Sequence, residues 1–240
     1  MSTLLIILLA CCCASFVQRV SGFGFGIFIM TVLPHVMPSY GEATTLSGLL
    51  ALVTSLTLVV RWWREISWRH LLPILSVFLV FSFFAVKCIA LIDTAVLKRV
   101  LGVTLILASL YFYYAADRIR LRPTWPVQGL LGTLSGLMGG FFGMQGPPAV
   151  LYFLNVSRTK EAYIALTQAY FLIGNVVMTL YRADSGFFTP TVTRAWCCAV
   201  PMVFVGTWLG GKVFRRIRIE ALRRVIYAYM ALSGVLALCA

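Results

Sequence analysis

The sequence predicts an all-α polytopic membrane protein, a helix bundle built from two inverted repeats with about eight to ten membrane segments. Hydrophobic residues make up 61% of the chain and charged residues only 11%, apolar runs recur along its whole length, and interruptions rich in glycine and proline recur at a fixed spacing. A soluble domain could not bury so much apolar surface. The runs lack the two-residue alternation of barrel strands, so we expect helices.

The repeat is visible in a glycine motif that is followed by a proline. Ser21, Gly22, Gly26 and Pro34 recur 114 positions later as Ser135, Gly136, Gly140 and Pro148. The offset grows to 119 between Glu42 and Glu161, as duplication followed by small loop insertions would produce. We therefore expect residues 1–115 to form a first transmembrane repeat, 116–126 a basic cytoplasmic linker, and 127–240 a second transmembrane repeat.

Five apolar segments are expected in each repeat. Those of the first repeat cover 4–20, 23–37, 42–60, 71–92 and 96–115, and those of the second cover 127–143, 144–156, 161–181, 194–214 and 222–240. No positive region precedes the first segment, so it is expected to be an integral helix rather than a cleaved signal. The second segment of each repeat is only about 20 Å long as a helix, against a hydrocarbon core of about 30 Å. It is therefore either a thin tilted span or an arm of a re-entrant hairpin.

The distribution of charge favours the inverted arrangement. If each glycine-rich pair crosses twice, each repeat has an odd number of crossings, and fifteen lysines and arginines face one side against five on the other. If each pair crosses once, the repeats are parallel and the split is eight against eleven, with Arg19 in mid-span. The positive-inside rule prefers the first split. We expect inverted repeats with both termini on the outer side.

The glycine-rich breaks allow two interpretations. Glycines four positions apart are typical of close helix packing. Broken helix ends at matched places in two inverted repeats also indicate a transporter site, where free N–H groups near the midplane bind an anion. On the second interpretation Arg19 is the candidate cation, although it could equally extend to the membrane surface. The candidate substrate-binding residues are Arg19, Ser21, Gly24, Gly26, Ser135, Gly139, Gly140, Gln145, Gln168 and Asn175.

The remaining polar residues predict no catalytic chemistry. Neither His35 nor His70 has a metal-like companion, and the seven acids are scattered, so we expect no catalytic constellation, metal site or cofactor and no enzyme activity. An intramembrane enzyme or assembly factor stays a less favoured alternative. The basic residues are short clusters between apolar runs, which indicates topology signals rather than nucleic-acid binding.

The sequence resembles the sulfite exporter TauE/SafE family of membrane permeases. The features that carry the resemblance are the two glycine motifs, the prolines that follow them and the start of the helix expected at residues 42–46. The resemblance covers essentially the whole chain. It departs from the family pattern in the second repeat, where Tyr163 and Ile164 stand in place of Thr44 and Thr45. The resemblance implies transport of small sulfur-containing or organic anions, such as sulfite, sulfonates or sulfoacetate, across the bacterial inner membrane.

We therefore expect a multi-pass protein of the bacterial inner (plasma) membrane that transports a small anion by alternating access. A passive anion channel or facilitator is the nearest alternative. The expected partners are the small anionic substrate and the lipid bilayer, and no nucleic acid. A coupling ion, H⁺ or Na⁺, and a homo-oligomer are left open by the sequence.

Overall fold

The computed structural model describes residues 3–114 and 122–214, together with positions 228, 231, 232, 234, 235 and 238. The structured elements of the two long ranges are helices, without a strand. They are α1 (Thr3–Ser21), α2 (Phe25–Ile29), α3 (Leu33–Val36), α4 (Tyr40–Trp62), the 3-10 helix η1 (Trp63–Glu65), α5 (Trp68–Ile89), α6 (Thr94–Tyr114), α7 (Trp125–Phe142), α8 (Gly146–Val156), α9 (Lys160–Asp184) and α10 (Pro190–Phe214). The prediction of an all-α membrane bundle is confirmed.

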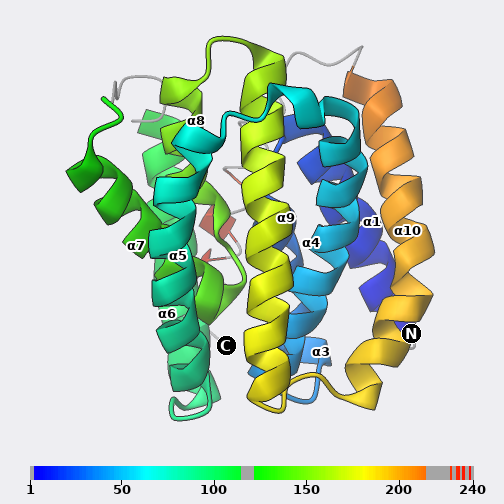
Figure 1. Cartoon of the computed structure of the whole chain (residues 1–240). Coiled ribbons are helices and arrows are strands. Elements are labelled where there is room, and N and C mark those ends of the chain that lie inside the picture. Colours follow the sequence, from blue (N-terminus) through cyan, green and yellow to red (C-terminus); the bar gives the residue numbers. More distant parts are fainter. Residues whose placement is uncertain are drawn as a thin grey trace.

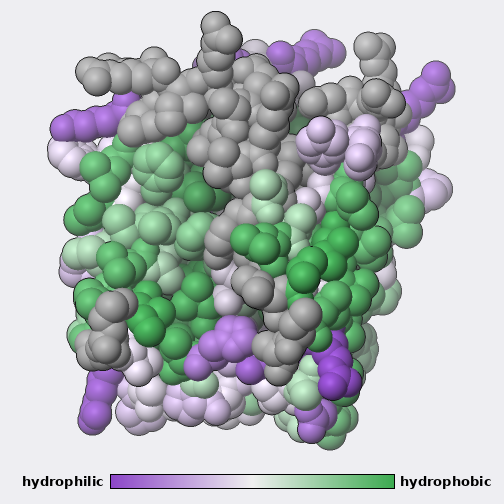
Figure 2. Space-filling model, turned by 180° about the vertical axis from the view of Figure 1, so that it is seen from behind, coloured by the Kyte–Doolittle hydropathy of each residue, from purple (hydrophilic) through white to green (hydrophobic). Residues whose placement is uncertain are grey.

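Six of these helices are long and apolar enough to cross a membrane: α1, α4 with η1, α5, α6, α9 and α10. Figure 2 shows the matching surface, in which a green hydrophobic belt lies between hydrophilic ends. The sequence analysis expected about eight to ten membrane segments because it also counted the glycine-rich segments and the last apolar run. The glycine-rich segments are α2 with α3, α7 and α8. The last run, residues 222–240, lies mostly outside the described residues.

The helices α4 and α9 begin in the same way. The Ser39 hydroxyl accepts a hydrogen bond from the Glu42 amide at 3.2 Å, and the Thr159 hydroxyl accepts one from the Ala162 amide at 3.1 Å. Such N-caps satisfy N–H groups that have no partner inside the helix. Matching caps at corresponding helices agree with an origin by duplication.

The two glycine-rich breaks do not follow the 114-residue offset. The helices end at Ser21 and Phe142, 121 positions apart, and the glycines after them, Gly22 and Gly143, have left-handed backbone with φ of +82° and +65°. The motif at 21–26 therefore spans a break, whereas the motif at 135–140 lies inside α7. The chain breaks between Phe142 and Gly146, where the expected segments 127–143 and 144–156 meet, whereas the expectation that Gly136 and Gly140 themselves interrupt a helix is wrong.

The glycines of α7 instead pack this helix against α5. A Cβ atom on Gly136 would lie 2.8 Å from the Phe78 carbonyl oxygen, and one on Gly140 would lie 2.4 Å from the Ala85 Cβ. Both distances are too short for any side chain. Close helix packing, one of the two interpretations of the glycines, therefore explains this part of the motif.

Contacts between helix pairs give their directions. Towards the end of α1, Cys12 faces Gly206 and Arg19 faces Gly210 further along α10, so α1 and α10 run parallel. The helices α5 and α7 are also parallel, because Gly132 faces Ile74 and Gly140 faces Ala85.

The central pair has the opposite relation. Arg182 in the last turn of α9 donates to the carbonyl oxygen of Thr44 near the start of α4, so α4 and α9 are antiparallel. Short turns follow α4 and α9, so the next helix in each case runs back. Together with the pair directions, these turns show that α1 runs opposite to α7, α4 opposite to α9, and α5 opposite to α10 (Figure 1). Each glycine-rich pair returns the chain to the side from which it came.

The helix directions place most described cations at one end of the bundle, the upper end in Figure 1. The cations at this end are Arg19, Arg61, Arg64, Arg69, Arg122, Arg158, Lys160 and Lys212, and those at the other end are Lys87, Lys98, Arg99 and Arg194. Arg182, which the sequence analysis assigned to the second group, is buried. The cytoplasmic side and the repeat boundaries stay predictions, and residues 115–121 of the linker lie outside the described residues.

Single cysteines in a cysteine-free background test the sidedness. We expect Ser67→Cys and Thr124→Cys to react with a membrane-impermeant maleimide only from the cytoplasm, because both lie at the cation-rich end. Phe188→Cys, in the turn between α9 and α10, should react only from outside. Reaction of Ser67→Cys and Thr124→Cys from different sides would contradict the helix directions.

Candidate functional site

A small cavity lies where the two breaks come together, next to Ala51 at the middle of α4. Its volume is about 30 Å³, and its walls come from α1, α2, α4, α9 and the segment between α7 and α8. Gln18, Gln145 and Asn175 supply its polar side chains. Residues 24–27 and 143–146 supply its backbone, and the remaining wall is formed by Ala51 and Phe171. Both breaks thus contribute directly to one site.

The breaks touch through their backbones. A Cβ atom on Gly26 would lie only 2.2 Å from the Gly143 carbonyl oxygen, so no other residue fits at position 26 without moving the chain. Gly143 itself ends α7, because its left-handed conformation lets its amide and that of Met144 bond back to carbonyl oxygens of the last turn. Glycine is therefore needed on both sides of the contact.

Buried amide side chains hold the first break. The Gln18 amide nitrogen donates to Gln168 at 3.2 Å and is 3.4 Å from the Ser55 hydroxyl. Gln168 in turn donates to the Gly22 carbonyl oxygen at 2.8 Å. This chain of bonds joins α1, α4 and α9 at the break. Sequence reasoning missed Gln18, although it stands three positions before Ser21.

The second break is held by hydroxyls. Tyr170 donates to the Ser135 hydroxyl at 2.8 Å, and Ser135 donates to the Gln145 carbonyl oxygen at 2.6 Å. The Gln145 side chain donates weakly to the Phe171 carbonyl at 3.4 Å, while its own Oε1 is buried without a hydrogen-bond partner. Gln145 is therefore a cavity residue with an unsatisfied hydrogen-bond acceptor.

A fully buried arginine lies near the cavity. Arg182 has no exposed surface, and its guanidinium donates to three backbone carbonyl oxygens: Thr44 at 3.0 Å, Gly139 at 2.9 Å and Gly140 at 3.4 Å. The last two belong to the end of α7, where the helix dipole is negative. The sequence analysis counted this arginine among the five cations of the less positive face and did not expect it to be buried.

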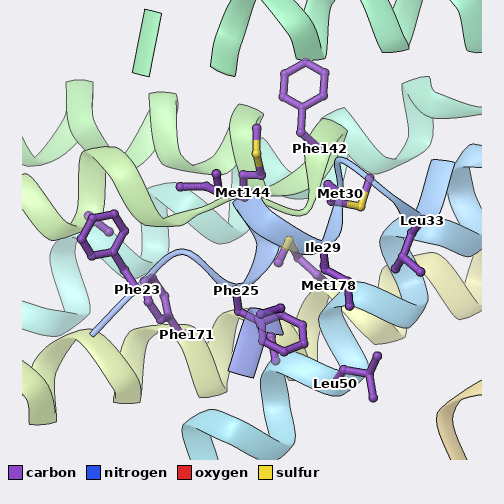
Figure 3. Close-up of a cluster of buried hydrophobic side chains, with 14 of the residues drawn as sticks. Phe23, Phe25, Ile29, Met30, Leu33, Leu50, Phe142, Met144, Phe171 and Met178 are labelled. Carbon is purple, nitrogen blue, oxygen red and sulfur yellow. The ribbon is translucent and has the colours of Figure 1, made fainter. Parts of the chain in front are cut away.

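Apolar side chains surround the breaks. In Figure 3, Phe23 lies beside Phe171, Phe25 faces the helix that carries Leu50, and Met30 lies between the breaks and Leu33. All six side chains are buried. Such an enclosure lowers the local dielectric constant and strengthens every electrostatic interaction inside it.

The predicted site residues divide into three groups. Gly24, Gly26, Gln145 and Asn175 line the cavity. Ser21, Ser135 and Gln168 hydrogen-bond the backbone of the breaks, and the carbonyls of Gly139 and Gly140 accept from Arg182. Arg19 is not at the cavity, because its side chain packs on Gly210 and Gly211 of α10.

Within the described ranges, no cluster of three histidine, cysteine or acidic side chains could hold a metal ion. The polar side chains that line the cavity are the amides of Gln18, Gln145 and Asn175, and amides bind anionic or polar solutes.

Comparison with known proteins gives consistent results. Residues 7–237 match the family described as sulfite exporter TauE/SafE. The chain is 24% identical to a protein of Cupriavidus necator named probable sulfite/organosulfonate exporter TauE, over 82% of this chain and 78% of the relative. It is also 24% identical to the probable membrane transporter protein MJ0441 of Methanocaldococcus jannaschii, over 89% and 87% of the two chains. No solved structure matches the chain.

The contact between the breaks can be tested at Gly26. We expect Gly26→Ala to abolish transport in proteoliposomes, because the added methyl group would overlap the Gly143 carbonyl oxygen. Gly129→Ala in α7 is the matched control, since nothing lies within 4 Å of its Cβ position, and it should transport as the wild type does. Full transport by inserted Gly26→Ala protein would show that the close approach is dispensable.

Proposed function

The chain belongs to the sulfite exporter TauE/SafE family, a family of membrane transporters, and we propose that it moves a small sulfur-containing or organic anion, of the sulfite, sulfonate or sulfoacetate type, by alternating access. The name of the C. necator relative supports this substrate class and supports export.

The observation that carries the proposal is the cavity at the meeting point of the two breaks. The amide groups of Gln18 and Asn175 can donate to the oxygens of an anion. Residues 24–27, where the first break leads into α2, line the same wall. Binding between two helices that are broken at corresponding places is the usual arrangement in secondary transporters.

The size of the cavity supports a moving carrier rather than an open pore. A volume of about 30 Å³ holds about two water molecules. Sulfite has four non-hydrogen atoms, so its binding requires the cavity to widen. In the proposed mechanism this arrangement is a closed state, and substrate enters when the helices around the breaks separate on one side.

Two tightly packed pairs suggest which parts move together. The pair α1–α10 and the pair α5–α7 each join one helix from either half of the chain through glycines that allow no added Cβ. We infer that each pair moves as a unit relative to α4 and α9. At the lower end, the exposed ion pair between Lys87 of α5 and Asp184 of α9 joins one unit to the centre. Exposed ion pairs contribute only about 0–1 kcal/mol, so this one can open readily.

Transport itself is tested with purified protein in proteoliposomes. We expect saturable uptake of radiolabelled sulfite, competition by sulfoacetate and methanesulfonate, and accumulation against a gradient when a proton or sodium gradient is imposed, because a coupled carrier concentrates its substrate. Protein-free liposomes are the control. Flux that rises linearly with sulfite concentration and never exceeds equilibrium would identify a passive channel instead.

The role of the buried amides is tested by a pair of variants. Gln18→Leu removes the hydrogen bonds to Gln168 and Ser55 next to the cavity, and Gln128→Leu removes a similar bond to Tyr152 away from it. Both should lower stability by about 1–3 kcal/mol.

Only Gln18→Leu should also raise the KM for sulfite, by about tenfold, the equivalent of about 1.4 kcal/mol. Thermal unfolding and initial uptake rates measure the two effects separately. Equal KM values in the two variants would mean that Gln18 supports the fold without contributing to the site.

A further inference from the structure

Arg182 carries a positive charge that no described acid balances. Its side chain is fully buried, and the ion pair found among the described residues, Lys87 with Asp184, is elsewhere. The guanidinium Nε also has no hydrogen-bond partner. A neutral donor would satisfy the carbonyl oxygens of α7 equally well, whereas a buried charge is costly unless it is paired. Ionisable side chains kept inside a membrane protein commonly mark the path of an ion or substrate.

The guanidinium points towards the cavity. Arg182 and Asn175 are seven positions apart on α9, so both lie on the same face of the helix. A Cβ atom on Gly48 would be 3.0 Å from Arg182 Nη1 and 3.6 Å from Asn175 Oδ1, which brings both side chains to one small area of α4. Asn175 lines the cavity. The charge of Arg182 therefore lies close to a side chain of the site.

We propose that Arg182 is the fixed positive charge of the anion site and makes it prefer doubly charged anions. The proposal rests on the function proposed above. As the helices separate, the carbonyl oxygens of Gly139 and Gly140 leave the guanidinium together with the end of α7. The anion then takes their place beside Asn175. In the closed state the same carbonyls keep the arginine solvated in the absence of substrate.

The expected preference of the site for doubly charged anions follows from electrostatics. In a poorly solvated site, the attraction of one guanidinium for an anion grows with the charge of that anion. Sulfoacetate carries two negative charges and methanesulfonate carries one, yet both present a sulfonate group. Their relative affinity therefore reports the charge of the site separately from its shape.

The experiment measures inhibition of labelled sulfite uptake by each of these anions, for the wild type and for Arg182→Gln. In Arg182→Gln the inhibition constant for sulfoacetate should rise by about tenfold or more, as expected for loss of a charge-assisted contact. The constant for methanesulfonate should rise clearly less, so the preference for sulfoacetate falls. Arg194→Gln is the matched control, because it removes an exposed charge at the same end of the bundle. It should keep the wild-type preference.

The outcomes separate this inference from the proposed function. If the wild type binds both anions and Arg182→Gln lowers only thermal stability, with the preference unchanged, Arg182 merely caps α7 and the inference is overturned. If the wild type takes up no small anion at all, the proposed function itself fails.

If Arg182→Gln does not insert, a second pair of variants decides. Thr179 Oγ1 is buried, lacks a partner and lies 3.8 Å from the same Gly48 position. Thr179→Asp should neutralise Arg182 and reduce the preference for sulfoacetate, while Thr179→Asn should leave it unchanged. Equal preferences in these two variants would overturn the inference.

Discussion

The contact between Gly26 and the Gly143 carbonyl oxygen is the constraint on which the rest of the site depends. Two helices that stop inside the bundle leave backbone groups without partners, which hydrocarbon does not tolerate. The contact between the two breaks reduces this cost, because each break shields the backbone of the other from lipid. The contact requires glycine at position 26, where a Cβ atom would lie 2.2 Å from the oxygen. Gln18, Ser55 and Gln168 secure the first break, and the Ser135 hydroxyl secures the second.

The same constraint explains why polar residues survive in this interior. A buried amide or hydroxyl is costly unless it is hydrogen-bonded, and most of those around the breaks are bonded to backbone carbonyls that the breaks expose. Gln145 Oε1 and Ser47 Oγ are exceptions, because both are buried without a hydrogen-bond partner. An unsatisfied acceptor beside a cavity of about 30 Å³ favours a state in which the site opens and admits a solute or water. The closed state is thus stabilised by the fold and destabilised locally at the site.

The sequence predicted the helices, the positions of the breaks and two of the cavity's three polar side chains, and its errors have physical causes. Four site residues could be predicted because dense glycines and polar residues are unusual in apolar runs: Gly24, Gly26, Gln145 and Asn175. Gln18 is a single polar residue near a helix end, where an amide is ordinary. Arg182 ends an apolar run, where sequence cannot tell a surface anchor from a charge that folds back into the bundle. The motif offset of 114 gave a wrong prediction for Gly136 and Gly140. In sequence, glycines that pack α7 on α5 resemble glycines that break a helix.

Corresponding helices of the two halves run in opposite directions and differ in charge, and on the function proposed above this difference in charge has a consequence for transport. Counting from the helix caps Ser39 and Thr159, Arg182 corresponds to Trp62, so one half supplies the cation and the other supplies none. On the proposal that Arg182 is the charge of the site, a site with its charge on α9 alone does not present the same face to both sides of the membrane. The affinity for substrate should then differ between the inward and outward states. Such a difference sets the KM on each side but does not set the direction of net transport, which depends on the gradients.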